Sequence, residues 1–183
     1  MKQLNLANVE EAKEFERVVP GGYICGITQV KDVPEQEYLL IEYDIADGPK
    51  KNYYRQLNEA KGFWGGKFVK SYKEKALPFF KAFITAVERS NAGYMWDNDE
   101  TKLKRKLVGL VLGEEEYRKN DGSIGKRLYV DQIHSVDKIR SLDYKIPELK
   151  KLAAPSITDP TTFTSSASFD SQFEDIEDDE LPF

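Results

Sequence analysis

The segment Tyr23–Gly48, YICGITQVKDVPEQEYLLIEYDIADG, contains two stretches with the residue pattern of β-strands. Residues 23–30 are rich in β-branched and aromatic side chains, which favour strands. Residues 37–47 alternate between two faces, with Leu39, Ile41, Tyr43 and Ile45 on one and Tyr38, Leu40, Glu42 and Asp44 on the other. This alternation is typical of a strand that buries one face. We therefore predict two strands joined across residues 31–36.

The pattern after these strands predicts a third strand and then a loop. Asp47-Gly48-Pro49 is a turn signal, and residues 52–57, NYYRQL, have the composition of a strand. Residues 62–68, GFWGGKF, contain three glycines, which disfavour regular structure. We expect the chain to leave the third strand through this irregular segment.

A helix and a second pair of strands follow. Between residues 71 and 93 apolar side chains recur at helical spacing, at Leu77, Phe80, Phe83, Ile84 and Val87. Pro78 lies near the expected start, where proline is tolerated, and Gly93 is the expected stop. Residues 106–118 and 125–136 are predicted to form two strands, because the Asp-Gly pair between them favours a chain reversal.

The predicted order is three strands, one helix and two strands, in a mainly β domain at residues 1–150 that includes an N-terminal extension. A five-stranded Greek-key barrel of the OB type has this order, with its helix between the third and fourth strands. Such barrels bind ligands on strands two and three, flanked by the loop after strand one and the loop before strand five. In this chain those loops are residues 31–36 and 119–125.

The C-terminal part of the chain differs in composition from the rest. Residues 156–173 are rich in Ser and Thr and lack a helical or strand period, so we predict a flexible linker at residues 151–173. Residues 174–183, EDIEDDELPF, form an acidic tail with six carboxylate side chains. All 27 Lys and Arg and 24 of the 32 acids precede residue 156, so a slightly basic domain carries an acidic tail. This asymmetry suggests a nucleic acid or another charged partner.

Several functional classes are disfavoured by what the sequence lacks. It has no run of about 18 apolar residues and no signal-peptide centre, so we expect a cytoplasmic protein without membrane contact. Cys25 is the only cysteine and His134 the only histidine, which excludes an internal disulfide and disfavours structural zinc. The carboxylates show no metal-loop spacing. We therefore predict no cofactor, no metal and no enzymatic activity.

Residues 50–55, KKNYYR, are the first candidate for binding single-stranded nucleic acid, since aromatic rings stack on bases and cations follow phosphates. The candidate contacts are Lys51, Tyr53, Tyr54 and Arg55. In a strand Tyr53 and Arg55 share one face and Tyr54 takes the other, so one tyrosine should face solvent. The alternative is that both tyrosines only form sheet and the lysines only solubilise a turn.

Two further groups are candidates for nucleic-acid contact. Trp64 and Lys67 lie in the glycine-rich loop, where the aromatic rings either meet a ligand or pack under the barrel. The remaining candidates are cations that could line a phosphate path: Lys104, Arg105, Lys119, Lys126 and Arg127. The alternative for this group is an ordinary solvated surface.

Two resemblances bear on function. The ending Asp178-Asp179-Glu180-Leu181-Pro182-Phe183 resembles the C-terminal peptide of bacterial single-stranded DNA-binding proteins, which more often has Ile where Leu181 stands. The stretches GGYICGI, YLLIEYDIADGPKKNYYRQL, KLVGLVLGEEEYR and GKRLYV resemble a family of phage-encoded, single-stranded DNA-binding OB-fold proteins over roughly residues 15–140. These resemblances imply a protein of an infected bacterial host whose tail, Asp178 to Phe183, docks partner proteins.

The expected function is sequence-independent binding and protection of single-stranded DNA in phage replication or recombination. The expected partners are single-stranded DNA and, through the tail, replication or recombination proteins. One alternative is an adaptor or inhibitor whose barrel binds protein and whose tail mimics DNA. An OB-fold nuclease is disfavoured because no metal-ligand cluster is apparent. The sequence leaves open the oligomeric state, a homo-oligomer included, and the choice between DNA and RNA.

Overall fold

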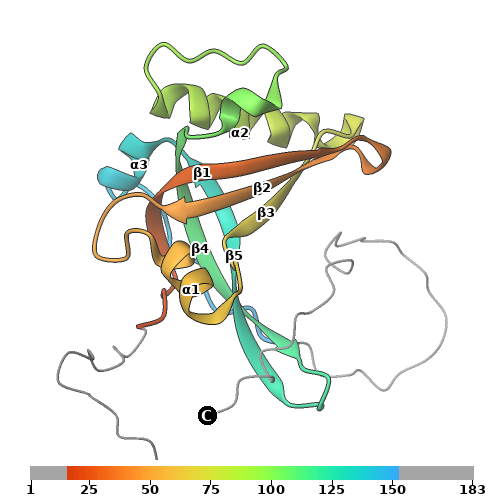
Figure 1. The fold of residues 1–183 in the computed structure, drawn as a ribbon, viewed down its shortest axis with the longest axis vertical. Helices are drawn as coiled ribbons and strands as arrows, with labels where there is room; N and C mark the ends of the chain where they lie inside the picture. The colour runs from red at the N-terminus through yellow and green to blue at the C-terminus, as the bar shows by residue number, and fades with distance from the viewer. Residues whose placement is uncertain (1–15, 153–183) are drawn as a thin grey trace, which may run out of the picture. The chain divides into compact units, whose positions relative to one another are not determined.

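The computed structural model describes residues 16–152, and these residues form one five-stranded antiparallel sheet (Figure 1). The strands are β1 (Gly21–Val33), β2 (Tyr38–Ile45), β3 (Lys67–Ser71), β4 (Leu107–Arg118) and β5 (Ile124–His134). Their order across the sheet is β3-β2-β1-β4-β5. Within residues 16–152 no strand pairing joins the edge strands β3 and β5, so the sheet is open at that point. The prediction of a mainly β domain is confirmed.

Three helices connect or follow the strands: α1 (Tyr53–Lys61), α2 (Leu77–Ser90) and α3 (Val136–Arg140). Short 3-10 turns lie at Pro34–Gln36, Glu74–Ala76 and Glu100–Leu103. The helix α2 lies between β3 and β4, as predicted, with Pro78 in its first turn. It packs against β3, β4 and β5, and in Figure 1 it lies at the top of the sheet.

The alternation of residues 37–47 produces the core. Leu39, Ile41, Tyr43 and Ile45 are all buried, so the predicted inward face of β2 is confirmed. Side chains from β1 and β4 meet them there, and Phe83 of α2 packs on the same cluster. Burying a large apolar side chain stabilises the fold by about 1.5–3 kcal/mol, and this cluster therefore dominates the stability of the sheet.

The predicted third strand at residues 52–57 is wrong, because this segment forms the start of α1. Asp44, which is buried on β2, explains the difference. Its carboxylate accepts hydrogen bonds from the backbone N–H groups of Tyr54 (2.9 Å) and Arg55 (3.2 Å). These amides would lack partners at a helix N-terminus, where a negative charge is also favourable. A side chain ten residues upstream therefore stabilises a helix that the local composition did not predict.

The third strand begins after the glycine-rich segment instead. Residues 62–66 are irregular, as predicted, whereas Lys67 and Phe68 already belong to β3. The backbone N–H of Tyr43 donates to the carbonyl of Gly66 (2.8 Å). A Cβ at Gly66 would lie 2.3 Å from the Tyr43 carbonyl oxygen. Only glycine permits this approach, so Gly66 brings β3 to the side of β2.

The described residues end at residue 152. The rest of the predicted linker at residues 151–173 and the whole predicted tail at residues 174–183 therefore lie outside them. The same holds for the first part of the N-terminal extension, residues 1–15.

Candidate nucleic-acid interface

The outward side chains of β1, β2 and β3 form a continuous surface. Pairing aligns Lys31 with Leu40 and Leu40 with Val69. The neighbouring rows are Val33–Tyr38–Ser71 and Gln29–Glu42–Lys67. Successive strand residues point to opposite faces, so these side chains point away from the buried face of β2. We call these nine residues the outer face.

The outer face combines half-buried apolar groups with exposed cations. Tyr38, Leu40 and Val69 are half-buried, whereas Lys31 and Lys67 are exposed. Lys67 forms an ion pair with Glu42 across the strands (3.2 Å), while Lys31 makes no ion pair within residues 16–152. A tyrosine ring with cations beside it is the arrangement that stacks a base and neutralises the adjoining phosphates.

The loop before β4 adds two cations beside β1. The backbone N–H of Arg105 donates to the carbonyl of Ile27 (2.7 Å), and Ile27 donates to the carbonyl of Lys106 (2.9 Å). Lys104 and Arg105 are both exposed. In the described part of the chain neither forms an ion pair. These two predicted site residues therefore lie next to β1, the strand that carries Lys31.

The cluster at residues 50–55 has a different geometry from the one predicted. Tyr54 is only 4% exposed, and its ring packs edge-on against Tyr43 (5.3 Å between ring centres). Burial raises the pKa of the Tyr54 hydroxyl. Its ring therefore offers no face to a base. Tyr53 is half-buried against Tyr54. Lys51, which precedes α1, and Arg55, which lies on α1, are both exposed. Contact of these last three with DNA stays a prediction.

Trp64 packs mainly within the protein. Its ring is half-buried against the core cluster, and Nε1 donates to the carbonyl of Gly66 (3.2 Å). This geometry matches the alternative in which the loop aromatics pack under the sheet. Phe63 is 40% exposed, so it is the more accessible aromatic ring of this loop.

The remaining cations lie on the β4–β5 hairpin, where glutamates of β4 face them. Lys126 pairs with Glu114 (3.5 Å), and Arg127 pairs with Glu115 (2.8 Å). Lys119 lies in the turn, where its backbone N–H donates to Ser123 (2.9 Å). β4 is 12 residues long, so its two ends are separated by roughly 35 Å. The predicted phosphate path therefore divides into two separate groups.

Of the nine residues of the outer face, sequence reasoning named only Lys67 as a site residue. It missed the other eight, among them Lys31, Tyr38, Leu40 and Val69. The signal was present in part, since the outward set of residues 37–47 contains Tyr38 and Leu40 beside two acids. The positions of Lys31 and Val69 on the same surface follow only from the strand register.

The only cysteine and the only histidine, Cys25 and His134, are held by burial and by a neighbouring side chain, respectively. Cys25 is fully buried, and burial raises the pKa of its thiol. His134 Nε2 lies 3.0 Å from Oε1 of Gln132, and partial burial, followed by the charge of Lys138, lowers its pKa. Over residues 16–152, no three His, Cys, Asp or Glu side chains gather in a way that could hold a metal ion. No helix in that range is long and apolar enough to cross a membrane.

No protein-family model matches the chain, and no curated protein matches it either.

Proposed function

We propose that this protein binds single-stranded DNA without sequence preference and protects it during phage replication or recombination. The observation that carries the proposal is the outer face, where Tyr38 lies one row from Leu40 and Val69, and Lys31 of β1 lies in the Leu40 row without an ion-pair partner within residues 16–152. Lys67 of β3 lies two rows from Tyr38 and is paired with Glu42. The ring supplies a stacking surface, and the cations attract the phosphates.

The strand order also supports the proposal. In an OB-type Greek-key barrel the first strand pairs with the second and the fourth, and the third and fifth strands lie on either side of the closure. The order β3-β2-β1-β4-β5 is compatible with such a barrel opened between β3 and β5. In OB-type barrels, strands two and three carry the ligand. The outer face is built on these same strands.

The mechanism needs no reactive group. Every base has a π-face, so a stacked tyrosine accepts any sequence, and phosphate neutralisation releases counterions whatever the base. Lys104 and Arg105 extend the cationic surface beyond the edge of β1. We propose that the bound DNA single strand crosses β3, β2 and β1 in that order and then meets the side chains of Lys104 and Arg105.

The acidic segment 174–183 completes the proposal. Its aromatic and acidic side chains suit an apolar pocket with a basic rim on a replication or recombination protein. We propose that this segment recruits such partners to DNA that the sheet has bound.

The test is a titration of fluorescently labelled oligo(dT), mixed-sequence oligonucleotide and duplex of equal length with the full chain. We expect the two single strands to bind similarly, the duplex much more weakly, and every affinity to fall as salt rises. Tighter binding of the duplex, or no binding of either single strand at low salt, would contradict the proposal. The second result would favour the protein-binding adaptor.

A further inference from the structure

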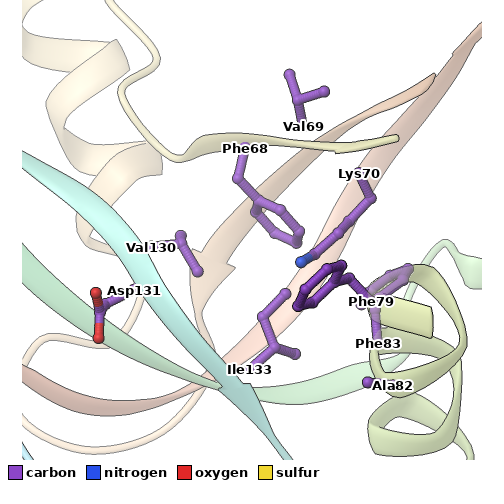
Figure 2. A pocket seen from close by; sticks show the side chains of 9 residues that line it. All are labelled: Phe68, Val69, Lys70, Phe79, Ala82, Phe83, Val130, Asp131 and Ile133. Atoms are coloured by element: carbon purple, nitrogen blue, oxygen red, sulfur yellow. The ribbon is translucent and has the colours of Figure 1, made fainter. Parts of the chain in front are cut away.

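A cavity of about 230 Å³ lies at the open edge of the sheet, between β3, α2 and β5. We call it the seam pocket (Figure 2). Its apolar lining comes from all three elements: Phe68 of β3, Phe79 and Phe83 of α2, and Val130 and Ile133 of β5. Phe79 is 70% exposed, so an aromatic ring forms part of the entrance. Cavities of about 150 Å³ already admit benzene, and the seam pocket therefore has room for a phenyl ring.

Lys70 places a positive charge inside this apolar surface. It shares the inward face of β3 with Phe68, whose ring packs against Phe83 (6.0 Å between ring centres). Figure 2 shows the Lys70 side chain extending among the aromatic rings that line the pocket. Burial lowers the pKa of this ammonium group, and within residues 16–152 it has no ion-pair partner. A half-buried cation without a partner is unfavourable, so an anion that entered the pocket would gain from pairing with it.

The carboxylate of Asp131 does not supply that anion. It accepts hydrogen bonds from the Tyr129 hydroxyl (3.2 Å) and the Gln132 amide (3.0 Å). In Figure 2 it lies well away from the Lys70 amino group. Within residues 16–152 no carboxylate pairs with Lys70, so a ligand that carries a negative charge would suit this position.

The backbone of β3 gives the ligand a second point of attachment. Among residues 16–152, β3 pairs with β2 along one edge, and no strand pairs with its other edge, which faces the seam. Val69 lines the pocket although Figure 2 shows its side chain pointing away, so its main chain faces the cavity. An unpaired strand edge accepts an added strand through main-chain hydrogen bonds.

We propose that the seam pocket is a docking site for an extended peptide of a partner protein, which adds as a strand along β3. The peptide places an aromatic side chain among the three phenylalanines and a carboxylate, two residues away on the same face, against Lys70. A nucleic acid is the poorer occupant, because it has no peptide main chain whose N–H and C=O groups could pair with the free edge of β3. The site uses the inward face of the sheet and does not depend on DNA binding by the outer face.

The test uses the full chain and an acetylated, amidated hexapeptide, Ser-Thr-Phe-Thr-Glu-Thr, followed by methyl NMR. We expect the methyl signals of Ala82, Val130 and Ile133 to shift on titration, while that of Ile124 on the β4–β5 hairpin stays in place. Replacing Glu by Gln in the peptide should weaken binding about tenfold or more, because a charge-assisted hydrogen bond is lost. N-methylation of the Thr between Phe and Glu should weaken it as well, because that amide can no longer bond to β3.

The protein variant Lys70→Met should remove the preference for Glu over Gln, and its matched control Lys75→Met should keep it. Both peptides binding alike to the parent chain would overturn the proposal. Equal methyl shifts with oligo(dT) would assign the pocket to DNA and overturn it too. Methyl shifts that follow protein concentration without peptide would assign the pocket to a second copy of the chain, which also excludes a partner peptide.

Discussion

The outer face and the β4–β5 hairpin both carry cations, but they differ in which of these cations form ion pairs. Arg127 forms an ion pair with Glu115, which lies opposite it on β4, and Lys126 forms one with Glu114 on the same strand. Lys31 on β1, and Lys104 and Arg105 beside it, have no such partners within residues 16–152. The number of cations in a segment therefore does not identify a phosphate site. The acids that the strand register brings opposite them decide how much charge remains available.

The largest expected effect tests the aromatic part of this comparison. Tyr38→Ala should weaken binding of oligo(dT) by about 1–3 kcal/mol, because a stacked base loses its platform. Tyr117→Ala is the matched control on the hairpin, where the Tyr117 ring packs with Arg127 (5.6 Å). Fluorescence anisotropy measures both affinities. An equal loss in the two variants would mean that the outer face has no special role.

The next effect tests the unpaired cations. Lys31→Gln combined with Lys104→Gln should reduce the slope of log affinity against log salt by about 1.4, since each phosphate contact on a single strand contributes about 0.7. Lys126→Gln combined with Arg127→Gln removes the same charge from the hairpin and should leave the slope nearly unchanged. A larger change in the hairpin variant would place the phosphate path there instead.

A smaller effect should appear in the stability of the hairpin variant. Loss of the Lys126–Glu114 and Arg127–Glu115 pairs should lower the free energy of unfolding by at most about 1 kcal/mol for each pair, because both are partly exposed. Urea denaturation measures this difference. A much larger loss would show that the pairs hold the hairpin together, and the hairpin would then be a poor control for DNA binding.

The smallest effect concerns pH. The folded pKa of His134 is lowered, so the unfolded chain binds its proton more readily. Stability should therefore fall as pH drops through about 6.5, the ordinary histidine value, toward the lowered folded value. His134→Gln should remove this part of the pH dependence in urea midpoints taken at about pH 7.5 and about pH 5.5. An identical decline in the variant would assign the effect to carboxylates.

The elements that could be predicted from the sequence are those whose apolar periodicity matches the face that they bury. The alternation of Leu39, Ile41 and Tyr43 has the period of the buried face it occupies, and the helical spacing around Phe83 matches the side of α2 that packs on the sheet. The segment at Tyr53 and Tyr54 was mistaken for a strand because its helix depends on Asp44, which local composition does not register.

The candidate site was predictable only in part, for a related reason. Lys67, Lys104 and Arg105 stood out as charges in the sequence. Whether a charge is cancelled depends on partners many residues away, such as Glu42 for Lys67. No pattern in the sequence indicates that Lys31 and Val69 lie on either side of Leu40. That arrangement exists only after β1, β2 and β3 pair in their register.

The bond between Asp44 and α1 has a consequence for how the molecule opens. The same carboxylate also accepts a hydrogen bond from the backbone N–H of Ile45 (2.8 Å), so one buried charge serves both β2 and the first turn of α1. Unravelling that turn alone would break the two bonds from Tyr54 and Arg55 and leave the carboxylate with only the Ile45 N–H among these three partners. The first turn should therefore open together with the sheet as one cooperative unit, and its amide protons should exchange with solvent as slowly as those of β2.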